Sequence, residues 1–218
     1  MTRLRLAALF SLAAALAATA WAWDRLPGRV PMHFDLHGQV DGTGPRASLF
    51  LLPAVMLAAW LFFEVLPRFD PRFAVPKPEQ TETERFGALH TAVALALGLL
   101  AGLQVLIIAQ ALGLLAEPPR AHALLLAGFL LLFGNFIGRL RPSWFLGIRT
   151  PWTLSSDEVW RRTHRLAGRL MVPGGLLALL LALLLPAERA FQAALVLLIA
   201  GLLIPAALSF FFWRKRAM

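Results

Sequence analysis

The sequence predicts an all-α, polytopic membrane bundle of about six transmembrane helices, and three observations lead to that prediction. Hydrophobic residues make up 59% of the 218-residue chain, and charged residues make up only 15%. The apolar residues form uninterrupted runs of about 18 or more, whereas a soluble domain spaces them at the period of a helix or a strand. The runs do not alternate in polarity, and a helix satisfies every backbone polar group within its own segment. We therefore expect helices whose outward faces contact lipid.

Six segments are long enough to cross a bilayer, which takes about 20 helical residues. The first segment also resembles a cleaved secretory signal, because Arg3 and Arg5 precede an apolar stretch that ends in small residues at 18–20. The apolar run continues through Trp21 and Trp23, which are typical of an interfacial anchor, and this favours a retained span. The expected spans are residues 6–23, 48–66, 88–112, 121–140, 166–186 and 190–213.

Lysine and arginine are distributed unevenly among the connecting segments. If the N-terminus is inside, the inside segments hold 16 of these residues and the outside segments hold 5. The positive-inside rule then predicts that both termini are cytoplasmic and that loop 24–47 is outside. Basic residues are retained on the cytoplasmic side and are attracted to anionic lipid headgroups, and this accounts for the net charge of +9. Nucleic acid is not expected as a partner, because the basic residues are divided among short loops.

The chain is expected to have three parts. Residues 6–66 form a first helical hairpin that carries loop 24–47, residues 67–87 form a Pro-rich and charged cytoplasmic linker, and residues 88–213 form a four-helix membrane region with a cytoplasmic loop at 139–169. We call residues 24–47 the histidine loop and residues 139–169 the signature loop. The other turns are too short for a site, so the candidate functional residues lie mainly in these two loops.

The histidine loop is rich in proline and glycine, which excludes a long helix. One extended piece is expected between Val30 and Leu36, followed by a turn at residues 41–42. Alternate residues of an extended piece share a face, so imidazole and carboxylate groups would either bind a divalent metal or hydrogen-bond the loop's own backbone, and the second interpretation is favoured. No other cofactor is expected, and without cysteine there is no thiolate site. The candidate binding residues are His33, Phe34, Asp35, Gly38 and Asp41, and the candidate metal ligands are His33, His37 and Asp41.

A helix is expected to begin near Ser156 in the signature loop and to continue into the fifth span. The reason is that Ser155, with Glu158 three residues later, forms a capping box. Trp160 and His164 are then neighbours at i and i+4. An amphipathic helix in the headgroup region explains this pattern without a special function.

Arg149 is not explained by that helix, because it stands between a glycine and a Thr-Pro turn. It is a candidate to pair with Asp157 or Glu158, or to bind a phosphate or a carboxylate bidentately. The candidate binding residues of this region are Asn135, Arg149, Thr150, Pro151, Trp152, Trp160, Thr163 and His164.

Polar residues within the spans are expected to form hydrogen bonds between helices, which is their usual role in lipid. These residues are Gln104, Gln110, Asn135 and Ser209. Glu64 and His90 lie near the same ends of their spans and are expected to pair.

Two stretches of the chain resemble a known family. The sequence Gly-Ile-Arg-Thr-Pro-Trp-Thr-Leu at 147–154, followed by Val159-Trp160 and by residues 163–168, resembles the signature of the SdpI family of bacterial membrane proteins. The pattern of Pro, His-Phe, Gly and Asp-Gly residues within 26–42 resembles the small uncharacterised domain that often precedes that signature. His37 is not part of that pattern, which weakens the idea of a two-histidine metal site. The resemblance covers most of the chain and implies a bacterial inner-membrane protein with an SdpI-like region at 88–213.

The resemblance also implies a function, immunity to a secreted, membrane-active peptide toxin. In this hypothesis the histidine loop and the outer halves of the helices intercept the peptide, and the signature loop braces the bundle or contacts a cytoplasmic protein partner as part of a signalling role. The alternative is a membrane enzyme or a lipid-headgroup-binding protein with an inner-face site at Arg149, Trp152, Trp160 and His164. An enzyme is disfavoured because no nucleophile–base pair or metal motif is visible. A small transporter is the third hypothesis, disfavoured because no ionisable residue lies near the middle of a span and no repeat is evident.

Overall fold

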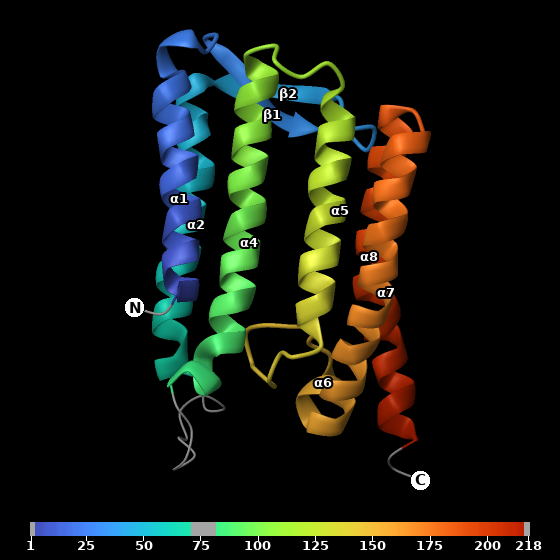
Figure 1. The fold of residues 1–218 in the computed structure, drawn as a ribbon. Coiled ribbons are helices and arrows are strands. Elements are labelled where there is room, and N and C mark those ends of the chain that lie inside the picture. The colour runs from blue at the N-terminus through green and yellow to red at the C-terminus, as the bar shows by residue number, and fades with distance from the viewer. Residues whose placement is uncertain (1–2, 71–81, 216–218) are drawn as a thin grey trace.

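The computed structural model describes residues 3–70 and 82–215. These residues form a bundle of long helices with a short β-hairpin across one end (Figure 1). We call this the hairpin end, and we call the opposite end, where the signature loop lies, the loop end. The long helices are α1 (Arg3–Ala22), α2 (Leu51–Val65), α4 (Glu82–Ala111), α5 (Pro118–Ile137), α7 (Asp157–Leu184) and α8 (Ala187–Arg214). The short elements are η1 (Trp23–Arg25), β1 (Arg29–Phe34), β2 (Val40–Pro45), η2 (Arg46–Phe50), η3 (Leu66–Arg68) and α6 (Pro151–Ser155).

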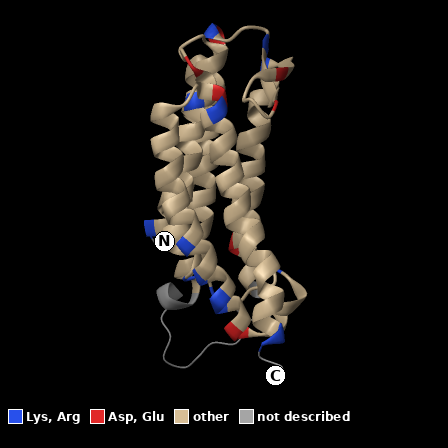
Figure 2. Ribbon diagram, turned by 90° about the vertical axis from the view of Figure 1, so that its right-hand side faces the viewer, with Lys and Arg blue, Asp and Glu red and all other residues tan. Residues whose placement is uncertain are grey.

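The six predicted spans are confirmed, because six helices of the described residues are long and apolar enough to cross a membrane. Charged residues gather toward the two ends of the bundle (Figure 2). This is the distribution that a hydrocarbon slab imposes on side chains. The fold is mostly helical, as predicted, and the hairpin is the part that the predicted class omitted.

The helices form two three-helix halves. One hydrophobic cluster joins α1, α2 and α4, and another joins α5, α7 and α8. Helix α4 belongs to the first half and faces the second half, where it contacts α5 (Figure 1). A third, smaller cluster packs β1 and the ends of α1 and α4 at the hairpin end.

Helices α5 and α7 approach closely through glycines. A Cβ added at Gly134 would lie 2.6 Å from the Cβ of Met171, and one added at Gly175 would lie 2.9 Å from the backbone N of Leu131. A Cβ at Gly168 would lie 2.7 Å from the carbonyl oxygen of Gly134. Small residues allow this approach, which gains dispersion energy where lipid offers no hydrophobic driving force between helices.

The histidine loop forms an antiparallel hairpin rather than one extended piece followed by a turn. Strands β1 and β2 pair Arg29 with Pro45 and Phe34 with Val40, with register shifts around His33. The expected turn at residues 41–42 is wrong, because both residues lie within β2. The chain reverses between Asp35 and Gln39 instead.

The start of α7 corrects a second prediction. Ser156, not Ser155, is the N-cap residue, and its hydroxyl accepts from the N–H of Val159. Ser155 instead ends α6, a short helix that the sequence pattern did not predict, and its hydroxyl donates to the carbonyl of Trp152 at 3.0 Å. Glu158 pairs with neighbouring arginines of the first two turns.

Polar residues join the helices of the first half. Gln104 on α4 donates to the hydroxyl of Thr19 on α1 at 2.8 Å, which places the first span within the bundle. Glu64 lies 3.9 Å from His90, as predicted, and also forms an ion pair with Arg5 at 3.0 Å that the sequence pattern did not predict. Asn135, by contrast, is exposed on α5.

The close packing of α5 on α7 predicts that Gly134→Ala lowers stability, because the new methyl group overlaps Met171 and must push the helices apart. We expect a loss of about 1–3 kcal/mol in the free energy of unfolding, read as a lower thermal midpoint of the purified protein in detergent. Gly128→Ala on the same helix is the matched control, because a Cβ there has nothing within 4 Å. Alanine is the better helix former, so this control keeps or raises the midpoint. Equal losses in both variants would contradict the prediction.

Candidate functional site

The predicted pair of Trp160 and His164 is stacked on α7, with ring centroids 4.1 Å apart. Both side chains are fully buried. The Nδ1 atom of His164 lies 2.8 Å from the carbonyl oxygen of Trp160, and the N–H of Ile148 donates to Nε2 at 2.9 Å. A carbonyl only accepts and an amide N–H only donates, so this imidazole is neutral and carries its proton on Nδ1. The indole N–H of Trp160 donates to the carbonyl of Leu140 at 2.9 Å. These bonds fasten residues 140–148 of the signature loop to α7.

Gly147 permits this arrangement. Its φ is +112°, a conformation that side chains rarely adopt. A Cβ there would lie 2.6 Å from Nε2 of His164 and 2.8 Å from the indole ring of Trp160. The glycine therefore lets the backbone lie directly against the stacked rings.

The Thr-Pro-Trp-Thr segment folds as helix α6. Thr150 is its N-cap and forms a reciprocal capping box with Thr153, and Pro151 occupies the first turn, where its missing N–H costs nothing. The hydroxyl of Thr153 is buried and also donates to the carbonyl of Ile148 at 2.9 Å. The predicted binding residues Thr150 and Pro151 thus have structural roles in this helix.

Helix α6 is joined to α8. The hydroxyls of Thr150 and Ser209 lie 2.9 Å apart. The ring of Trp152 packs against both Phe210 and Trp213, with centroid distances of 5.1 Å and 6.0 Å. The signature loop therefore connects α5, α7 and α8 at the loop end.

A buried carboxylate links the signature loop to the other half of the bundle. Asp70, which is 0% exposed, accepts from the hydroxyl of Ser143 at 2.9 Å and from the N–H of Trp144 at 3.0 Å. From the sequence, this residue was expected in the charged cytoplasmic linker 67–87, and its contact was not predicted. Residues 71–81 of that linker lie outside the described residues. The feature that could have indicated the contact is an acidic residue two positions after η3, at the end of a span.

The signature residues differ in accessibility. Trp160, Thr163 and His164 are fully buried, so they do not present an inner-face site for a headgroup. Arg149 is exposed, and one of its guanidinium nitrogens donates to the carbonyl of Trp144 at 3.0 Å. Among the residues predicted to form an inner-face site, Arg149 is the cation that is accessible at the surface.

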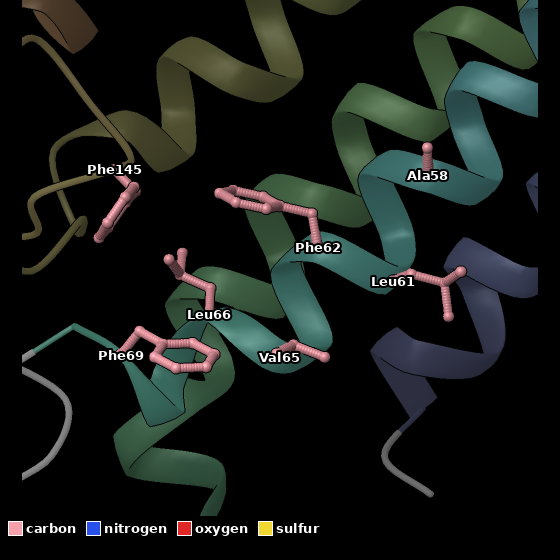
Figure 3. Close-up of a pocket in the computed structure, with 7 residues that line it drawn as sticks. All are labelled: Ala58, Leu61, Phe62, Val65, Leu66, Phe69 and Phe145. Carbon is pink, nitrogen blue, oxygen red and sulfur yellow. The ribbon is translucent and has the colours of Figure 1, made fainter.

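An apolar groove of about 580 Å³ lies beside the signature loop. Figure 3 shows Phe145 of the loop facing Phe62 of α2, with Phe69 at the end of η3 below them. The rings of Phe62 and Phe145 are 6.1 Å apart. The groove is open on the side of the bundle, because Leu61, Phe62 and Val65 of its lining are exposed. Its lining residues are Ala58, Leu61, Phe62, Val65, Leu66, Phe69 and Phe145.

At the hairpin end, Asp35 organises the turn between the strands. Its carboxylate accepts from the N–H groups of Gln39 at 2.9 Å and His37 at 2.8 Å. These hydrogen bonds, of which the one from Gln39 has the largest effect, hold the pKa of Asp35 below its usual value. Gly38 has a φ of +76° and lies against Phe191 of α8, where a Cβ would come within 3.0 Å of the ring.

The polar side chains of the hairpin fall into separate pairs. His33 and Asp41 form one pair across the strands, with Nδ1 and Oδ1 2.5 Å apart. His37 lies 3.0 Å from the amide of Gln192 on α8 instead. The structure therefore brings together two of the three candidate metal ligands, and the described residues contain no group of three or more side chains that would hold a metal ion.

Further contacts seat the hairpin on the second half of the bundle. The amide of Gln39 donates to Glu188 of α8 at 2.9 Å. The ring of Phe34 lies 5.2 Å from His122 of α5, which in turn lies 6.2 Å from Phe191. His122 was not predicted as a contact of the hairpin, although a histidine near the start of an apolar span could have indicated one. The hairpin thus bridges the two halves (Figure 1).

The contact between Gly147 and the stacked rings predicts that Gly147→Ala destabilises the loop end. The variant must bear a strained φ and displace His164 or Trp160, so we expect a loss above the roughly 1–2 kcal/mol of a left-handed residue alone. The measurement is the thermal midpoint together with tryptic cleavage after Arg149. Gly113→Ala isolates the backbone cost, because Gly113 has a φ of +69° and open space around its Cβ. A loss no greater than that of this control would refute the packing role.

Comparisons with known proteins agree with this geometry. Residues 139–212 match the model of the SdpI/YfhL protein family, and residues 10–57 match that of a domain of unknown function, DUF1648. The chain is 24% identical over 193 residues to the immunity protein SdpI of Bacillus subtilis (strain 168), which covers 88% of this chain and 87% of that protein. No solved structure matches the chain. The chain therefore carries an SdpI/YfhL family region at residues 139–212, preceded by a DUF1648 region at residues 10–57.

Proposed function

We propose that this chain is an SdpI-like membrane immunity protein that gives resistance to a secreted, membrane-active peptide. The observation that carries the proposal is the similarity to an immunity protein along nearly the whole of both chains, 88% of this one and 87% of the relative. Six apolar helices agree with a protein that meets such a peptide within the bilayer. The signature loop and the histidine loop both fall within matched regions.

The proposed location is the bacterial cytoplasmic membrane, with both termini in the cytoplasm. The segments on the same side of the membrane as the N-terminus hold 16 lysine and arginine residues, and those on the opposite side hold 5, which supports this orientation. The hairpin end then faces outward, toward a secreted peptide, and the loop end faces the cytoplasm.

Cysteine labelling tests this orientation directly, because the chain contains no cysteine. Leu36 at the hairpin turn is 75% exposed, and Ser155 at the loop end is also exposed. We expect a membrane-impermeant maleimide to label Leu36→Cys in intact cells and to label Ser155→Cys only after permeabilisation. The reverse pattern would invert the proposed orientation.

The working face that we propose is the hairpin end. The His33–Asp41 pair is accessible, with side chains 74% and 46% exposed. The tip of the hairpin contacts α8 through exposed hydrogen bonds of Gln39 and His37, whereas β1 is anchored by Val30, which is fully buried. Exposed hydrogen bonds and ion pairs are weak, because water competes for both partners. The tip of the hairpin is therefore able to adjust to a peptide, whereas the loop end is fixed by buried bonds.

Survival under peptide challenge tests the function. We expect expression of this chain in a bacterium sensitive to SdpI-type killing peptides to raise the lethal peptide concentration. The His33→Ala, Asp41→Asn double variant removes the exposed pair without touching the core, and we expect it to lower that protection at matched membrane abundance. Arg149→Ala is the control at the opposite end and retains protection.

The outcomes separate the two ends of the molecule. Protection that survives the double variant and is lost in Arg149→Ala would move the working site to the loop end, where an exposed arginine near an apolar groove favours an anionic lipid headgroup. No protection against any of the peptides, at normal abundance, would count against immunity itself.

A further inference from the structure

A small pocket of about 240 Å³ lies at the hairpin end, separate from the exposed His33–Asp41 pair. Four elements form it: Pro31 and Met32 of β1, Ser48 and Leu49 of η2, the start of α2, and α4. Its volume is that of one large side chain, below the range of about 300–1,000 Å³ for pockets that hold a whole small molecule. The lining residues are Pro31, Met32, Ser48, Leu49, Leu51, Leu52, Val55, Gln104 and Ile107.

The pocket opens to the membrane. Leu51 and Val55, on the first turns of α2, are 60% and 56% exposed. They lie in the first turns of the candidate span Arg46–Val65, near the end at which a span meets the headgroup region. Aromatic side chains with one polar atom concentrate at this depth.

Gln104 lines the pocket and has an unpartnered acceptor. The residue is 0% exposed, and its Nε2 donates both to the hydroxyl of Thr19 at 2.8 Å and to the carbonyl of Leu49 at 3.0 Å. A carbonyl cannot donate, so Nε2 must face Leu49 and the orientation of the amide is fixed. Its Oε1 has no hydrogen-bond partner. A buried acceptor without a donor is costly, and the cost is recovered when a ligand supplies the donor.

We propose that this pocket binds one aromatic side chain of the membrane-active peptide, a tryptophan or a tyrosine, whose N–H or O–H donates to Oε1 of Gln104. This inference rests on the proposed immunity function. The apolar walls match the ring, and the unpartnered Oε1 of Gln104 matches a ring with one donor. Phosphate and ester oxygens of lipids only accept hydrogen bonds, so they cannot satisfy this atom. The pocket thus distinguishes tryptophan and tyrosine from phenylalanine.

Binding of two matched indoles tests the pocket without the peptide. The probes are 5-fluoroindole and 5-fluoro-1-methylindole, titrated against the full chain in nanodiscs and followed by fluorine NMR. The methyl group replaces the donor and leaves the ring unchanged. We expect saturable binding of 5-fluoroindole and about tenfold weaker binding of the methylated probe, from the loss of one buried hydrogen bond. Equal affinities would overturn the proposal.

Two valine substitutions on α2 provide the matched pair of variants. Val55→Phe fills the mouth of the pocket, whereas Val65→Phe adds the same bulk at the other end of the helix, in the groove of Figure 3. Both valines are exposed, at 56% and 41%, so both variants should fold. We expect donor-selective binding to disappear in Val55→Phe and to persist in Val65→Phe. Selective binding that persists in Val55→Phe would place it elsewhere and overturn the proposal.

Survival assays with the same variants separate this inference from the immunity function. Loss of protection in Val55→Phe, with protection kept in Val65→Phe, supports the pocket as a contact of the peptide. If Val55→Phe loses indole binding but keeps protection, the assignment to the peptide is overturned and immunity stands. If the wild-type chain gives no protection, immunity fails, and with it the assignment to the peptide, whatever the indole result.

Discussion

The loop end of the bundle depends on one hydrogen bond, from the N–H of Ile148 to Nε2 of His164. In lipid, irregular backbone persists only where its polar groups are satisfied within the protein. This bond fixes the turn at Gly147, which in turn leads into α6 and its contact with Ser209 of α8. At its other end the same loop binds Asp70, which follows η3. A single buried imidazole therefore orders the segment that joins the two halves of the bundle.

The two ends of the molecule hold the halves together by different means. At the loop end the bonds are buried, and breaking one leaves an unsatisfied polar group, at a cost of about 1–3 kcal/mol. At the hairpin end, the bonds from Gln39 to Glu188 and between His37 and Gln192 are exposed, and water replaces them at little cost. The tip of the hairpin is thus held on α8 less firmly than the signature loop is held at the loop end, although Val30 of β1 is buried in the core.

Local patterns predicted much of this structure, and contacts between distant residues account for most of what they missed. The spans, the helix that runs from the signature loop into α7, and the Trp160–His164 pair follow from hydropathy and helical spacing, which act over a few residues. The contact of Asp70 with Ser143 joins residues 73 positions apart, so no local pattern encodes it. The hairpin was misread because Asp41-Gly42, a common turn pair, is overridden by the turn that Asp35 and Gly38 form. In the candidate site, the sequence indicated His33, His37 and Asp41 together as candidate ligands of one metal. The register aligns His33 with Gly42, next to Asp41, so the hairpin joins His33 with Asp41, whereas His37 contacts Gln192.

The residues that make this chain recognisable and the residues that would meet a ligand are different sets, and packing explains why. Gly147, Trp160 and His164 each make contacts that no other side chain reproduces, because any Cβ, smaller ring or charged ring would break the stack. Such residues form a recognisable signature whether or not they touch a ligand. A pocket wall such as Val55 tolerates many apolar side chains, so it leaves no motif. The signature therefore identifies the scaffold, and the specificity that we propose lies in the less constrained residues beneath the hairpin, where Gln104 keeps an acceptor without a partner.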